Sequence, residues 1–123
     1  MFYNAFISLS FIITLVSFPV FSQSCDIAGI WKHTEKDVSL VLDTSLQTIK
    51  VKQHSLNAGV EGLTVVKNLL PDVAQPNLWS GDIYSADINS FVPVQLKSPD
   101  CTTLLITENA VSKKEILRLI RQQ

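Results

Sequence analysis

Alternating apolar and polar residues mark short strands in the first half of the chain. In segment 37–43 aliphatic side chains recur at every second position, and in segment 47–53 isoleucine and valine alternate with threonine and lysine. A period of two that includes β-branched residues is typical of a half-buried strand. Asp43-Thr44-Ser45 supplies turn residues between the two segments. The pattern therefore predicts a β-hairpin.

Similar short apolar segments occur before and after this hairpin. It predicts further strands at 28–34, 62–70, 78–84, 91–96 and 101–107. Turn-forming residues separate them at intervals of roughly 10 residues, which is typical of a small sandwich or an up-and-down barrel. Gly81 lies inside a predicted strand, where a glycine indicates a bulge or bend. We expect an all-β fold, a small antiparallel up-and-down barrel of about eight strands.

The last element, 112–123, is ambiguous. Ser112 followed by Glu115 fits a helix-capping box, and good helix formers follow. Leu117 and Leu119 with Arg118 between them also fit a strand. Local sequence slightly favours a C-terminal helix, whereas the need to close the edge of a barrel favours a strand.

The first 22 residues resemble a secretory leader. An apolar run at 5–18 is followed by Pro19 and then Val20-Phe21-Ser22, which suits a cut after Ser22. We expect a signal peptide at 1–22, a single domain at 23–123, and a periplasmic or secreted location. The leader has no lysine or arginine. A cut after Ser24, a retained membrane anchor and lipidation at Cys25 are the alternatives.

Charge and cysteine content narrow the class of protein. With 10 basic and 11 acidic residues the formal net charge is −1, and all of these residues follow the leader. Nucleic-acid binding is not expected, because it requires a clearly basic surface. Cys25 and Cys101 are the two cysteines. An even count in an exported chain predicts a disulfide between them. Two buried free thiols are the alternative, as is half of a metal site, which their spacing does not favour.

Catalytic chemistry is not indicated. His33 and His54 each lie at the polar end of a strand, and there is no G-x-S-x-G motif. Asp82 and Asp87 lack the spacing of a calcium loop. We expect a protein that is not an enzyme and that uses no metal or cofactor. Its partner would be an apolar small molecule or an envelope protein.

Ten aliphatic residues are expected to face the barrel interior: Ile30, Leu40, Leu42, Ile49, Val51, Val65, Ile83, Val94, Leu104 and Ile106.

Two motifs resemble known families. Gly29-Ile30-Trp31 at the start of the first strand is similar to the G-x-W signature of lipocalins. This resemblance implies that Gly29 and Trp31 are structural and that Trp31 plugs the closed end of a barrel. Trp79-Ser80-Gly81-Asp82-Ile83-Tyr84 resembles a block of the domain-of-unknown-function 2147 family, small exported bacterial proteins thought to be lipocalin-like. Ser85-Ala86 replaces that family's Asp-Pro, and Leu119-Ile120-Arg121 stands where it has W-x-R.

The segment from Ser80 to Tyr84 also fits the S-G-x-x-Y pattern of periplasmic lysozyme inhibitors. Two functions therefore compete. A carrier of an apolar small molecule should have an internal pocket near Trp79 and Tyr84, the candidate ligand-binding residues. A protein-interaction module should have a filled barrel, with Ser80 to Tyr84 displayed on an exposed edge or loop.

Overall fold

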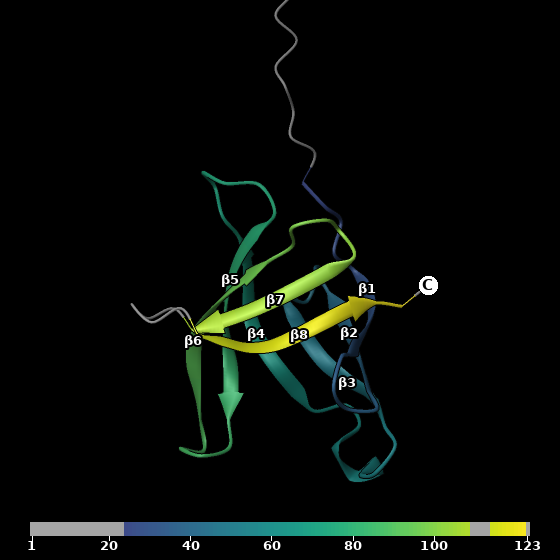
Figure 1. Ribbon diagram of the computed structural model, residues 1–123. Helices are drawn as coiled ribbons and strands as arrows, with labels where there is room; N and C mark the ends of the chain where they lie inside the picture. Colours follow the sequence, from purple (N-terminus) through teal and green to yellow (C-terminus); the bar gives the residue numbers. More distant parts are fainter. Residues whose placement is uncertain (1–23, 109–113, 123) are drawn as a thin grey trace, which may run out of the picture.

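Eight strands make up the domain. The computed structural model describes residues 24–108 and 114–122 (Figure 1). The predicted leader and its cleavage site after Ser22 lie outside the described residues. The strands are β1 (Gly29–His33), β2 (Val38–Asp43), β3 (Thr48–His54), β4 (Thr64–Pro71), β5 (Leu78–Ser85), β6 (Ser90–Lys97), β7 (Thr103–Glu108) and β8 (Glu115–Arg121). One 3-10 turn, η1 (Ala58–Val60), lies between β3 and β4.

The strands form a closed antiparallel barrel in which each pairs with its neighbours in sequence. β1 also pairs with β8, and Trp31 lies opposite Arg121 across this closing seam. The predicted up-and-down barrel is confirmed. Because the number of strands is even, both described chain ends lie at one end of the barrel, which we call the terminal end (Figure 1).

The last element is a strand, so the local preference for a C-terminal helix was wrong. β8 pairs with β7 on one side and with β1 on the other. Leu119 points inward and is fully buried, while Ile120 beside it is about half exposed. Pairing on both sides satisfies the backbone groups of β1 and β7 that would otherwise form open edges. This stabilisation by long-range strand pairing outweighs the local preference for a helix. Ser112, the residue of the predicted helix cap, lies outside the described residues.

Aliphatic side chains fill the barrel interior. Most of the predicted inward residues are buried: Leu40, Leu42, Ile49, Val51, Ile83, Val94, Leu104 and Ile106. Ile30 and Val65 are only partly buried. Their neighbours Trp31 and Val66 are fully buried instead, and side chains alternate along a strand, so only one of each adjacent pair can point inward.

The irregularity expected at Gly81 lies on the neighbouring strand. β5 pairs with β6 without a shift, whereas the register of β4 against β5 shifts between Lys67 and Leu70. Asn68 in this bulge has φ +56°. A Cβ at Gly81 would lie 3.0 Å from Val66 Cγ1 and 3.3 Å from the Lys67 carbonyl oxygen. Gly81 therefore allows β4 to bulge tightly over β5.

Trp31 is the centre of packing at the terminal end. It is fully buried, and its indole Nε1 donates a hydrogen bond to the Ile27 carbonyl at 2.9 Å. The Arg121 guanidinium lies 4.8 Å from the Trp31 ring centroid and donates to the Asp26 carbonyl. Gly29, two residues before Trp31, has φ +129°, a conformation that favours glycine. The contacts of Trp31 thus join the segment before β1 to the end of β8.

The predicted disulfide is present. Cys25 and Cys101 are bonded, with their Cα atoms 5.3 Å apart. The bond ties the segment before β1 to the turn between β6 and β7. It also leaves no free sulfur on Cys25 for attachment of a lipid.

Candidate functional site

The segment from Ser80 to Tyr84 lies in the barrel wall and presents alternate residues to solvent. Along β5, Trp79, Gly81 and Ile83 are buried, while Ser80 and Tyr84 are exposed and Asp82 is half-buried. This alternation follows from the period of two in an extended strand. The S-G-x-x-Y segment thus displays its serine, aspartate and tyrosine on the outer surface.

An aromatic and charged cluster surrounds Tyr84 on the outside of the barrel. Tyr84 lies opposite Phe91 on β6, and their ring centroids are 5.6 Å apart in an edge-on arrangement. Lys67 on β4 reaches across β5, and its ammonium lies 4.1 Å from the Phe91 ring centroid. Asp82 lies opposite Lys67 and accepts a hydrogen bond from Asn68 Nδ2 at 2.8 Å. We call Lys67, Asp82, Tyr84 and Phe91 the outer patch.

Local contacts hold the outer patch in place. The Tyr84 hydroxyl donates to Asn89 Oδ1 in the turn between β5 and β6. Asn89 has φ +50°, a left-handed conformation that asparagine tolerates better than most residues. Tyr84 remains 44% exposed despite these contacts. The patch therefore presents a positioned aromatic ring to solvent.

Trp79 and Tyr84 do not share a pocket. Trp79 is 7% exposed and points inward near the terminal end, whereas Tyr84 points outward near the opposite end. Five residues of extended strand separate their Cα atoms by about 17 Å. These two residues therefore do not line one internal pocket together, as was expected for a carrier.

Among the surface cavities of the described residues, two lie next to turns and loops at the ends of the barrel. One of about 830 Å³ lies between the β1–β2 turn and the start of β8, and its lining includes His33, Lys36 and Arg118. The other, about 330 Å³, lies at the terminal end between Ser24-Cys25 and the loop from Pro71 to Leu78. Both are open to solvent. We call the second the terminal cleft, and Trp79 is among its lining residues.

Both histidines cap turns. His33 Nδ1 accepts hydrogen bonds from the backbone N–H groups of Glu35 at 2.9 Å and Lys36 at 3.2 Å. Burial lowers the pKa of His33, nearby Lys36 lowers it further, and Glu35 partly offsets both. His54 Nδ1 accepts from the Leu56 N–H at 3.2 Å. The acceptor nitrogen of each ring is therefore already engaged by backbone.

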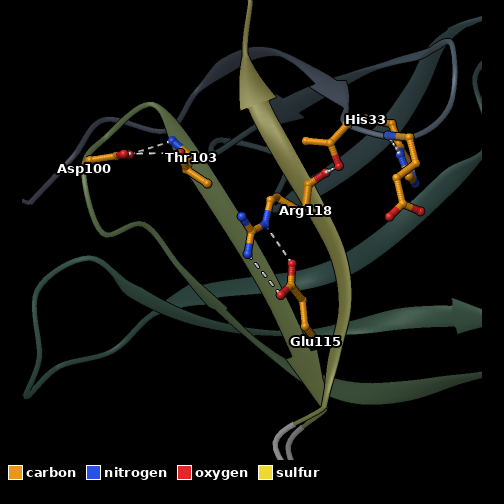
Figure 2. A network of polar contacts seen from close by, with 7 residues as sticks. His33, Asp100, Thr103, Glu115 and Arg118 are labelled. Atoms are coloured by element: carbon orange, nitrogen blue, oxygen red, sulfur yellow. Dashed lines mark hydrogen bonds and ion pairs between the residues drawn. The ribbon is translucent and has the colours of Figure 1, made fainter.

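Carboxylates also serve local structure (Figure 2). Asp100 Oδ1 accepts from the backbone N–H groups of Thr102 and Thr103, and these bonds lower the pKa of Asp100. Glu115 pairs with Arg118 at 2.9 Å, which lowers the pKa of Glu115 and raises that of Arg118. Within residues 24–108 and 114–122, no three His, Cys, Asp or Glu residues are grouped so as to hold a metal ion.

Three contributors to these sites were missed at the level of sequence. Lys67 and Phe91 join Tyr84 only through the register of three neighbouring strands, which alternation alone does not fix. Arg121 packs on Trp31 across the closing seam of the barrel. The Asn89 turn was the available signal for Phe91, because a tight turn there places residue 91 opposite residue 84.

The protein is a small disulfide-bonded antiparallel β-barrel with a filled interior, and it carries the outer patch on its surface. In comparisons with known proteins, no family model, curated protein or solved structure matches this chain. Within the part of the chain that the structure describes, no helix is long and apolar enough to cross a membrane.

Proposed function

We propose that this domain is an exported, non-enzymatic module that binds a protein partner of the cell envelope through the outer patch. The proposal rests on where the apolar side chains and the aromatic and charged groups lie in the barrel. The barrel interior holds a continuous cluster of buried aliphatic and tryptophan side chains. The aromatic and charged groups of the Ser80 to Tyr84 region face outward.

The filled interior favours a docking surface over a carrier. An eight-stranded barrel has an interior just wide enough to be filled by side chains or to hold one small ligand. Here Trp31, Leu96, Leu104, Ile106 and Leu119 are fully buried inside it. At the end opposite the termini, Val60 of η1 packs against the same core. An apolar ligand would have to displace these side chains.

The composition of the outer patch suits protein recognition. Tyrosine and other aromatic residues are enriched at the centres of protein interfaces, where they combine a large apolar surface with a polar group. Tyr84 is held by Asn89 and by Phe91. A positioned side chain loses less conformational entropy on binding than a free one. Leu70, 47% exposed beside Ser80, lies on the same outer face of the β4–β5 hairpin.

The disulfide and the predicted leader support an extracytoplasmic location for this function. The Cys25–Cys101 disulfide is typical of a small domain in an oxidising compartment. In such a domain a covalent bond supplements a core of limited size. The apolar leader would deliver the chain there.

Site-specific photo-crosslinking in the producing cells tests the proposal. A photoreactive residue replaces Phe91 in the outer patch or, as a matched control, Lys32, which is exposed on β1. We expect a discrete protein adduct from position 91 and none from position 32. Adding Tyr84→Ser should suppress the adduct from position 91 without lowering the amount of folded protein. Equal adducts from both positions, or no effect of Tyr84→Ser, would contradict docking at the outer patch.

A further inference from the structure

Asn77 joins three segments at the terminal end. Its side-chain Oδ1 accepts a hydrogen bond from the Cys25 backbone N–H at 2.6 Å. Its carbonyl accepts from the Ser98 N–H at 3.0 Å. Asn77 has φ +59°, in the left-handed region. It thus ties the loop between β4 and β5 to the N-terminal segment and to the turn between β6 and β7.

The disulfide connects two of the same segments. Cys101 is bonded to Cys25 and donates its backbone N–H to Ser98 Oγ at 3.1 Å. The Ser98 hydroxyl donates to the Thr103 carbonyl at 2.8 Å, and Ser98 is only 1% exposed. Cys25, Cys101, Ser98 and Asn77 therefore form a closed ring of one covalent bond and three hydrogen bonds.

The loop held by this ring projects from the barrel. Figure 1 shows it extending beyond the strands, at the same end as the N-terminal segment. Asp72 organises the loop: its N–H donates to the Leu78 carbonyl at 2.8 Å, and its Oδ1 accepts from the N–H groups of Ala74 and Gln75. Val73 at the tip is fully exposed. The terminal cleft lies between the loop and Ser24-Cys25.

We propose that the Cys25–Cys101 disulfide is a redox switch that controls this loop and the terminal cleft. With the disulfide formed, the Cys25 N–H is held against Asn77 and the loop is fixed. When the disulfide is reduced, the N-terminal segment separates from Asn77, the loop becomes mobile, and the cleft opens beside Trp79. The barrel remains closed, because strand pairing between β1 and β8 does not involve the disulfide.

The reductant is a dithiol. Cys101 is the exposed cysteine, whereas Cys25 is buried. A thiolate of the dithiol attacks the Cys101 sulfur, and Cys25 leaves as a thiolate that takes up a proton. The second thiol of the reductant then attacks the reductant sulfur that is bonded to Cys101. This step forms the disulfide of the oxidised reductant and releases Cys101 as a thiol. The protein gains two electrons and two protons, and the dithiol becomes a disulfide.

Hydrogen exchange on the mature chain, oxidised or reduced with dithiothreitol, tests the switch. Reduction should accelerate exchange of the Cys25, Asp72 and Ser98 amides by at least about tenfold, because local opening then exposes them. The Ser45 and Leu46 amides donate to Asp43 at the same end of the barrel, away from the disulfide. Their exchange should be unchanged. Acceleration of all these amides alike, or of none, would overturn the proposal.

A variant with the disulfide intact tests the same coupling from the other side. Asn77→Gly removes the acceptor for Cys25 and keeps the left-handed backbone accessible. Because coupling is reciprocal, it should favour reduction in dithiothreitol redox buffers by about fivefold or more. Asn89→Gly, at a left-handed asparagine at the opposite end, is the matched control and should shift reduction less than about twofold. Equal shifts in the two variants would show that Asn77 does not couple the loop to the disulfide.

Discussion

At the scale of single residues, buried aromatic side chains and turn caps should have the clearest effects on the free energy of unfolding. Trp31 combines complete burial, a hydrogen bond to Ile27 and the Arg121 guanidinium over its ring. Tyr84 has a different role, because it is about half exposed and contacts Phe91 and Asn89 on the outer surface. The two aromatic residues should therefore respond very differently to truncation.

Replacing Trp31 by alanine should lower the free energy of unfolding by about 3–5 kcal/mol, because it removes a fully buried aromatic side chain. Tyr84→Ala, the matched control at the surface, should cost less than about 1 kcal/mol. Urea denaturation of both variants provides the measurement. An unchanged midpoint for Trp31→Ala would mean that Trp31 does not support the core.

His33 should make stability depend on pH between neutral and mildly acid conditions. Its folded-state pKa lies below the ordinary value of 6.5, so the fold favours the neutral ring. The contribution of the neutral His33 ring to the free energy of unfolding is fully present above pH 6.5. It is lost as the pH falls through the folded-state pKa. Protonation also removes the Nδ1 acceptor for the N–H groups of Glu35 and Lys36.

The His33→Asn variant isolates this effect, because asparagine keeps a side-chain acceptor for those N–H groups at every pH. The stability lost between pH 7 and pH 5, measured by thermal unfolding, should be smaller in the variant than in the natural chain. An identical loss in both proteins would assign the pH dependence to other groups.

At the scale of elements, sequence alternation predicted the strands well because each has one buried face. It failed where a strand departs from strict alternation or depends on a distant partner. The bulge at Asn68 moves the irregularity from Gly81 to β4. The identity of β8 depends on pairing with β1, whose partner residues lie 86 to 90 positions earlier in the chain. Local pattern carries no information about such contacts.

Gly81→Ala tests the fit between β4 and β5. The added Cβ would lie 3.0 Å from Val66 Cγ1 and 3.3 Å from backbone at Lys67. We expect a loss of about 1–3 kcal/mol, which is typical of overpacking. Gly59→Ala is a suitable control, because a Cβ there meets only the Asn57 side chain. Equal stability of the Gly81→Ala variant and the natural chain would show that β4 adjusts freely.

At the scale of the whole molecule, the sequence predicted the barrel and the disulfide but could not determine which residues share a surface. The barrel followed from evenly spaced strands, and the disulfide from two cysteines in a chain predicted to carry a leader. Whether Trp79 and Tyr84 share a pocket depends on which face of β5 each occupies. The outer patch requires in addition the registers of β4 and β6.

Export makes a direct prediction about the mature chain. Intact mass of the secreted or periplasmic protein should correspond to a chain that begins at Gln23 and contains one disulfide, because the leader layout suits a cut after Ser22. A retained Met1 would indicate an uncleaved anchor. Added diacylglycerol on Cys25 would indicate a lipoprotein without the Cys25–Cys101 bond.

We propose that the barrel interior is filled and that function lies on the outer surface. Titration of the purified mature domain with an apolar fluorescent dye tests this claim most directly. We predict no saturable binding, because the interior positions are occupied by a continuous core. Saturable binding of one dye per molecule, displaced by an unlabelled apolar compound, would contradict the account and indicate a small-molecule carrier.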